Sequence, residues 1–129
     1  MKLWRLIAVL LLGLAIIVPA SAVEPGTSAK ILLQSSPLAG FRYYEGKRLW
    51  SEMKVGDTLQ LVREPDNSYD ANAVRVEWQG HKLGYVPRAD NEALARFMDR
   101  GSKASARITR LKKSRNPWQR MEFEVYLGL

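Results

Sequence analysis

The stretch AVRVEWQGHKLGYV, residues 73–86, indicates the fold most clearly. Its first half alternates: Val74, Val76 and Trp78 would share one face of a strand, and the charged residues between them the other. Gln79-Gly80 is a turn signal, and a second apolar run follows it. The stretch therefore predicts an antiparallel hairpin, and Pro87 directly after it marks its end.

On the N-terminal side of this hairpin, residues 58–63 predict another strand because Leu59 and Leu61 alternate with Gln60. Ile31 to Ser36 predicts the first strand, which Pro37 ends. On the C-terminal side, Leu94, Phe97 and Met98 follow helical spacing. Asp90 or Asn91 can cap this helix and Gly101 can stop it.

The C-terminal part holds two more alternating runs, residues 104–111 and 121–127, joined by the basic segment KKSRNPWQR at residues 112–120. Short strands, tight turns and one or two helices predict a mainly β fold of the α+β class. A small, closed or partly closed OB-like barrel would protect the sheet edges. We expect the barrel to span residues 31–129, with residues 23–30 as a flexible lead.

The N-terminus has the three parts of a secretory signal peptide. Lys2 and Arg5 precede an apolar run of 13 residues, Leu6–Val18, and Ala20-Ser21-Ala22 follows it. A membrane span needs roughly 20 apolar residues, so we expect a signal-peptide helix over residues 1–22, cleaved after Ala22, in place of a stable anchor. The sequence thus predicts export to the periplasm or the exterior.

Charge and cysteine content limit the partners. The 129-residue chain has no cysteine, which excludes disulfides, thiolate metal sites and a lipidated cysteine. Removal of residues 1–22 takes away two basic residues and no acidic one, so the net charge falls by two, from +7 to +5. A basic domain favours anionic partners, among them nucleic acid, acidic glycans and anionic lipid headgroups. We expect a monomer.

Enzyme and metal signals are weak. Alternate polar residues from Asp66 have the spacing of a calcium loop, but Ala71 stands where that loop needs glycine. His81 is the one histidine and no nucleophile elbow is present. Asp66, Asp70 and Arg63 could imitate a metal-dependent nuclease, but they occupy a single loop. We therefore expect no cofactor, no metal and no catalytic activity, with a hydrolase as the most distant alternative.

The loop REPDNSYDANAV, residues 63–74, has the polar composition of a turn but carries a tyrosine in its middle. Aromatic and basic residues also interleave in GFRYY, residues 40–44, and around Trp118. Aromatic faces stack on bases and guanidinium groups hold phosphates, so these loops have the chemistry of a single-strand binding surface. Loop aromatics that only cover the barrel ends are the alternative.

Four motifs together resemble the HIRAN domain, a module of fork-remodelling ATPases that also occurs alone in bacterial proteins. They are GFRYY at 40–44, LVREPDNSYDANAVRV at 61–76, LGYVPR at 83–88 and ALARFMDRG at 93–101. The resemblance implies an OB-like barrel that binds single-stranded DNA at a free 3′ end.

Site residues follow from matching positions. The resemblance implies that Tyr43 and Tyr69 sandwich the terminal base and that Asp70 accepts a hydrogen bond from the 3′-hydroxyl. The remaining implied contacts are Asn67, which shapes the loop, Arg42 and Arg88, which meet phosphates, and Trp118, which supports the next base. The alternative function is an exported interaction domain in which the same barrel binds a peptide, a glycan or an envelope protein.

Overall fold

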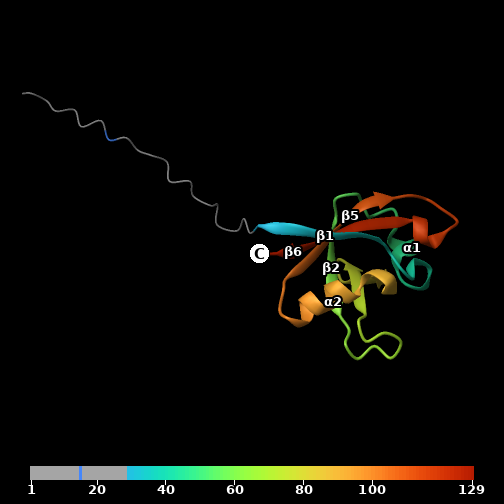
Figure 1. Cartoon of the computed structure of the whole chain (residues 1–129). Helices are drawn as coiled ribbons and strands as arrows, with labels where there is room; N and C mark the ends of the chain where they lie inside the picture. Colours follow the sequence, from blue (N-terminus) through green and yellow to red (C-terminus); the bar gives the residue numbers. More distant parts are fainter. Residues whose placement is uncertain (1–14, 16–28) are drawn as a thin grey trace, which may run out of the picture.

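The computed structural model describes residue 15 and residues 29–129 (Figure 1). The expected signal peptide, its cleavage site and most of the lead lie outside the described residues. Six strands follow one another: β1 (Lys30–Pro37), β2 (Thr58–Arg63), β3 (Val74–Trp78), β4 (His81–Tyr85), β5 (Ala104–Leu111) and β6 (Met121–Gly128). The helices are α1 (Gly46–Leu49) and α2 (Glu92–Asp99), with 3-10 turns η1 (Phe41–Tyr43), η2 (Arg88–Asp90) and η3 (Pro117–Gln119).

All described strand pairs are antiparallel, in the order β1-β6-β5-β2-β3-β4. No ladder joins the two edge strands, so the sheet is not a closed barrel. Instead the chain beyond β1 reaches β4 at one point, where Ala39 and Tyr85 exchange two backbone hydrogen bonds of 2.9 Å. The fold is thus a partly closed, OB-like sheet, as the strand pattern predicts.

The core follows the alternation in the sequence. Val74, Val76 and Trp78 of β3 are buried. Every second residue of β6 is buried too, from Met121 to Leu127. A fully buried aliphatic or aromatic side chain of this size stabilises the fold by about 1.5–3 kcal/mol, so the period-2 pattern fixes which face packs inward.

The predicted hairpin is confirmed, and its turn sets the pairing of the residues next to it. Gln79 and Gly80 both have positive φ, 47° and 81°, as the primed two-residue turn requires. Next to the turn, Trp78 pairs with His81 and Glu77 with Lys82; the register then shifts by one residue, so that Val76 pairs with Gly84 and Arg75 with Tyr85. The loop between β2 and β3 projects from the sheet past α2 (Figure 1).

The predicted helix α2 is also confirmed, but its N-terminus differs from the expectation. Leu94 is buried and Phe97 and Met98 are partly buried. Gly101, with φ of 89°, donates to the Met98 carbonyl and Ser102 donates to the Phe97 carbonyl, which is a Schellman C-terminus. Asn91 occupies the N-cap position, yet its side chain does not cap the helix. It binds the loop before β3 instead. Among the described residues no helix is long and apolar enough to cross a membrane.

Candidate functional site

The loop between β2 and β3 is an ordered turn built around Asn67. Its side-chain oxygen accepts hydrogen bonds from the backbone N–H groups of Tyr69 (2.9 Å) and Asp70 (3.1 Å). At the base of the loop, the Glu64 N–H donates to the Ala73 carbonyl at 2.9 Å. Such side-chain-to-backbone bonds are the reason why asparagine favours tight turns. The polar composition of the loop therefore determines one conformation.

Glu64 supports this turn from below. Its carboxylate accepts hydrogen bonds from the Asn67 amide (3.1 Å), an Arg75 guanidinium nitrogen (2.6 Å) and the Tyr85 hydroxyl (3.0 Å). Burial alone would raise the pKa of Glu64, but these three donors hold it below its ordinary value of 4.5. The carboxylate is therefore ionised at neutral pH and ties the loop to β3 and β4.

Asp70 is held in one orientation by two donors. Its Oδ1 accepts from the Asn72 N–H at 2.9 Å and its Oδ2 from the Asn91 amide at 2.7 Å. Asn91 is itself buried, 2% exposed, at the start of α2. The Asp70 side chain remains 21% exposed, and the Arg88 Nε lies 3.9 Å from its Oδ2. Each carboxylate oxygen can accept a further bond, so a ligand hydroxyl has an acceptor here.

Tyr69 is the most exposed large aromatic residue on the described surface, at 86%. The turn holds its backbone, and the Arg88 guanidinium donates to its carbonyl oxygen. The ring therefore stands in solvent on a fixed backbone. An exposed aromatic face of this kind can stack on a flat ligand ring.

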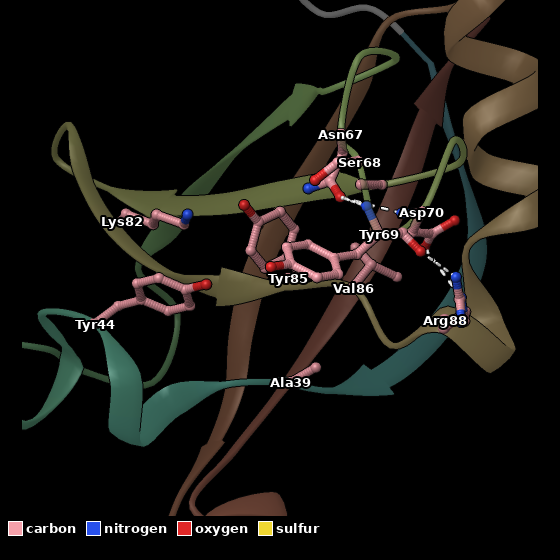
Figure 2. Close-up of a pocket in the computed structure, with 11 residues that line it drawn as sticks. Ala39, Tyr44, Asn67, Ser68, Tyr69, Asp70, Lys82, Tyr85, Val86 and Arg88 are labelled. Atoms are coloured by element: carbon pink, nitrogen blue, oxygen red, sulfur yellow. Dashed lines mark hydrogen bonds and ion pairs between the residues drawn. The ribbon is translucent and has the colours of Figure 1, made fainter.

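Asn67, Tyr69 and Asp70 line one pocket of about 610 Å³ together with Arg88 (Figure 2). Asp70 and Arg88 lie at one end of it, and Tyr44 and Lys82 lie at the other, with Tyr85 between them (Figure 2). The full lining is Ala39, Tyr44, Asn67, Ser68, Tyr69, Asp70, Ala73, Lys82, Tyr85, Val86 and Arg88. We call this cavity the end pocket.

The far end of the end pocket carries a positive charge between two aromatic rings. The Lys82 Nζ lies 4.1 Å from the ring centroid of Tyr44 and 4.6 Å from that of Tyr85. Burial alone would lower the pKa of Lys82, but the Tyr85 hydroxyl and the nearby negative charges raise it above its ordinary value. Lys82 is therefore a charged donor at neutral pH, held on aromatic faces.

The structure brings four of the seven predicted site residues together: Asn67, Tyr69, Asp70 and Arg88 all line the end pocket. The other three do not line it. Arg42 lines a neighbouring hollow, while Tyr43 on η1 and Trp118 on η3 are exposed at 68% and 52%. The turns η1 and η3 contact each other, so these side chains come from adjoining surfaces.

Sequence reasoning did not assign Glu64, Asn91, Lys82, Tyr44 and Tyr85 to the site. Tyr44 and Tyr85 fall within the motifs GFRYY and LGYVPR, which was the available signal. The described residues contain no cluster of three acidic or histidine side chains that could hold a metal ion. His81 faces Glu45, with 3.2 Å between Nδ1 and Oε2, and does not line the end pocket.

The sequence model of the HIRAN domain matches residues 31–129, nearly the whole described region. The chain therefore belongs to the HIRAN domain family. It is 30% identical over 77 residues to a Fanconi-associated nuclease 1 homolog from Oryza sativa, covering 57% of this chain and 8% of that protein. It is 40% identical over 63 residues to the helicase-like transcription factor of Oryctolagus cuniculus, covering 48% of this chain and 6% of that protein. The match thus involves a small part of these relatives.

Two solved structures share the fold. A protein from Lactobacillus plantarum is 30% identical, with a TM-score of 0.69 over 79% of this chain and 98% of that one. The HIRAN domain of human HLTF is 24% identical, with a TM-score of 0.59 over 77% of this chain and 79% of that one. The overall arrangement of strands is therefore shared with these two proteins.

Proposed function

We propose that this domain binds single-stranded nucleic acid, with a preference for strands that have a free 3′ end, and that it is not catalytic. The observation that carries the proposal is the placement of Asp70, a partly exposed carboxylate fixed by Asn91 and Asn72, next to the exposed ring of Tyr69. A base stacked on Tyr69 would bring its sugar toward Asp70.

The charge of Asp70 supports a preference for ends. A terminal hydroxyl can donate a charge-assisted hydrogen bond to the carboxylate. An internal phosphodiester at the same place carries a negative charge and no donor, so it is repelled. A carboxylate in the end pocket is therefore unfavourable for the interior of a strand and favourable for its hydroxyl terminus.

The opposite charges in the end pocket support the same proposal. Arg88 is 74% exposed beside Asp70, and Lys82 lies at the far end between the rings of Tyr44 and Tyr85. A pocket with one carboxylate and a cation at each end suits a ligand with a hydroxyl end and a phosphate one nucleotide away. Aromatic rings suit bases of any sequence, since every base has a stacking face.

A comparison of linear and circular DNA tests the proposal. We expect a linear 20-nucleotide single strand with a free 3′-hydroxyl to bind at least roughly tenfold more tightly than the same sequence closed into a circle, because the circle offers phosphates but no end. Fluorescence anisotropy competition at fixed salt measures the ratio. Equal affinity for the two forms would contradict end recognition and would leave a general polyanion or envelope partner as the ligand.

We also propose that the domain acts after export, on the basis of the charged start, apolar run and small-residue end of residues 1–22. Mass spectrometry of the protein from an envelope fraction should show a chain that begins at Val23. A cytoplasmic protein with an intact Met1 would contradict this proposal.

A further inference from the structure

A second hollow, of about 480 Å³, lies beside the end pocket and is strongly basic. It is formed by η1, α1 and the chain between β5 and β6. Its charged lining residues are Arg42, Lys47, Lys113 and Arg120, and none of its lining residues is acidic. We call it the basic groove. The basic segment of residues 112–120 contributes Lys113, Ser114 and Arg120 to this groove, whereas none of its residues lines the end pocket.

The cations of the basic groove differ from most arginines of this domain because they are not paired with carboxylates. Within residues 29–129, none of the four forms an ion pair. Arg42 donates to the Tyr43 hydroxyl at 2.6 Å, and Arg120 donates to the Ser114 carbonyl at 2.7 Å. By contrast, Arg63, Arg75, Arg96, Arg107 and Arg110 each bind an acidic side chain. The groove therefore concentrates uncompensated positive charge.

Aromatic rings also line the basic groove, and one of them lies under Arg120. Phe41 is buried and meets Trp50 edge to face, with 5.6 Å between ring centroids. The Arg120 guanidinium lies 5.3 Å from the Phe41 ring centroid. Packing thus holds Arg120 in place while its charge faces the groove, and a held cation loses less freedom on binding an anion.

One short segment connects the two cavities. Ala39 and Tyr44 line the end pocket, whereas Phe41 and Arg42 line the basic groove. Tyr43 lies between them in sequence, is 68% exposed, and has the Arg42 guanidinium 4.8 Å from its ring centroid. A ligand that extends from the end pocket along this segment therefore comes within reach of Arg42.

We propose that the basic groove binds the phosphodiester groups of the same single strand on the 5′ side of the nucleotide in the end pocket. The inference rests on the proposed function, because it assigns the 3′ terminus to the end pocket. Nucleic acid fits better than an acidic protein segment for two reasons. The segment of residues 39–44 borders both cavities, and the exposed ring of Tyr43, on which a base can stack, lies against the unpaired Arg42.

Oligonucleotides of different length distinguish binding in the end pocket from binding in the basic groove. Anisotropy is measured for the full chain with oligothymidylates of 3, 6, 9 and 12 nucleotides that end in a 3′-hydroxyl. The test variant is Lys47→Glu/Lys113→Glu, which reverses two exposed charges of the groove. The control variant, Lys54→Glu/Lys103→Glu, makes the same change of net charge at exposed positions outside both cavities.

We expect affinity of the wild-type and control proteins to rise with length beyond three nucleotides. The groove variant should lose this gain, so its affinity for the 12-mer should be at least roughly tenfold lower than that of the wild type. The slope of log affinity against log salt should become shallower by about 1.4, the value for two lost phosphate contacts. The trinucleotide should still prefer a 3′-hydroxyl over a 3′-phosphate. These results would support the binding of phosphodiester groups in the basic groove.

Other outcomes overturn the inference. Equal loss in the groove and control variants would mean that only net charge is sensed, and an unchanged length dependence would mean that the strand leaves by another route. Competition by polyglutamate as strong as that by the 12-mer would assign the groove to an acidic protein segment. In these cases the proposed function still stands if the wild-type protein prefers a trinucleotide with a 3′-hydroxyl over one with a 3′-phosphate. If that preference is absent, both the proposed function and the role of the basic groove are overturned.

Discussion

Replacing Gly84 by alanine is expected to lower the free energy of unfolding by about 1–3 kcal/mol, the usual effect of an added methyl group in a closely packed site. A Cβ at residue 84 would lie 2.1 Å from the carbonyl oxygen of Ala39. That contact is with backbone, which cannot move aside without breaking the Ala39–Tyr85 bridge. Urea denaturation followed by tryptophan fluorescence measures the change.

The matched control is Gly128→Ala. There the nearest atom to a new Cβ is 3.6 Å away, an ordinary van der Waals distance, so the variant should unfold close to the wild type. Because Tyr85 lines the end pocket, Gly84→Ala should also weaken ligand binding. Wild-type stability of Gly84→Ala would show that the bridge does not hold the two sheet edges together.

Tyr69→Ala is expected to weaken single-strand binding by about 1–3 kcal/mol, the value of one stacked base. The ring is 86% exposed, so its removal should change the free energy of unfolding by less than about 0.5 kcal/mol. Isothermal titration calorimetry gives the affinity, and thermal unfolding shows that the fold is intact.

Tyr69→Phe is the informative companion to this variant. It keeps the aromatic face and removes only the hydroxyl, so it should bind nearly as well as the wild type. Unchanged affinity of Tyr69→Ala would remove Tyr69 from the site. A loss in Tyr69→Phe as large as in Tyr69→Ala would assign its effect to a hydrogen bond in place of stacking.

The strands, the hairpin and α2 could be predicted from the sequence because their signals are local. Alternation along β3 and β6, the Gln79-Gly80 turn and the Gly101 stop each depend on residues a few positions apart. The four-residue helix α1 was not predicted, since one helical turn leaves no period to detect. The Ala39–Tyr85 bridge was also missed, because it joins positions far apart in the chain.

The same distinction applies to the site. Asn67, Tyr69 and Asp70 belong to one loop whose composition is unusual, and the structure places them together with Arg88. Asn91 has the pattern of a helix cap, and only the fold shows that its amide binds Asp70 instead. Glu64 and Lys82 read as ordinary surface charges, because Arg75, which binds Glu64, and Tyr44, which lies under Lys82, are distant from them in the sequence. The contacts of such residues depend on tertiary structure.

Recognition of a 3′-hydroxyl by Asp70 is tested with paired oligonucleotides. The affinity of the wild-type chain is measured for one short single strand ending in 3′-hydroxyl and for the same strand ending in 3′-phosphate. Asp70→Asn is the comparison, because it keeps the size of the side chain and an oxygen for the Asn72 N–H while it removes the charge. Its amide nitrogen replaces the Oδ2 that accepts from Asn91, so thermal unfolding of the variant is measured to show that the fold is intact.

We expect the wild type to favour the hydroxyl strand by about 1.5–3 kcal/mol, the range for a hydrogen bond to a charged group. The preference should shrink or disappear in Asp70→Asn, because a neutral amide no longer repels the phosphate. Equal binding of the two strands by the wild type, or an equal preference in wild type and variant, would contradict recognition of the strand end by Asp70.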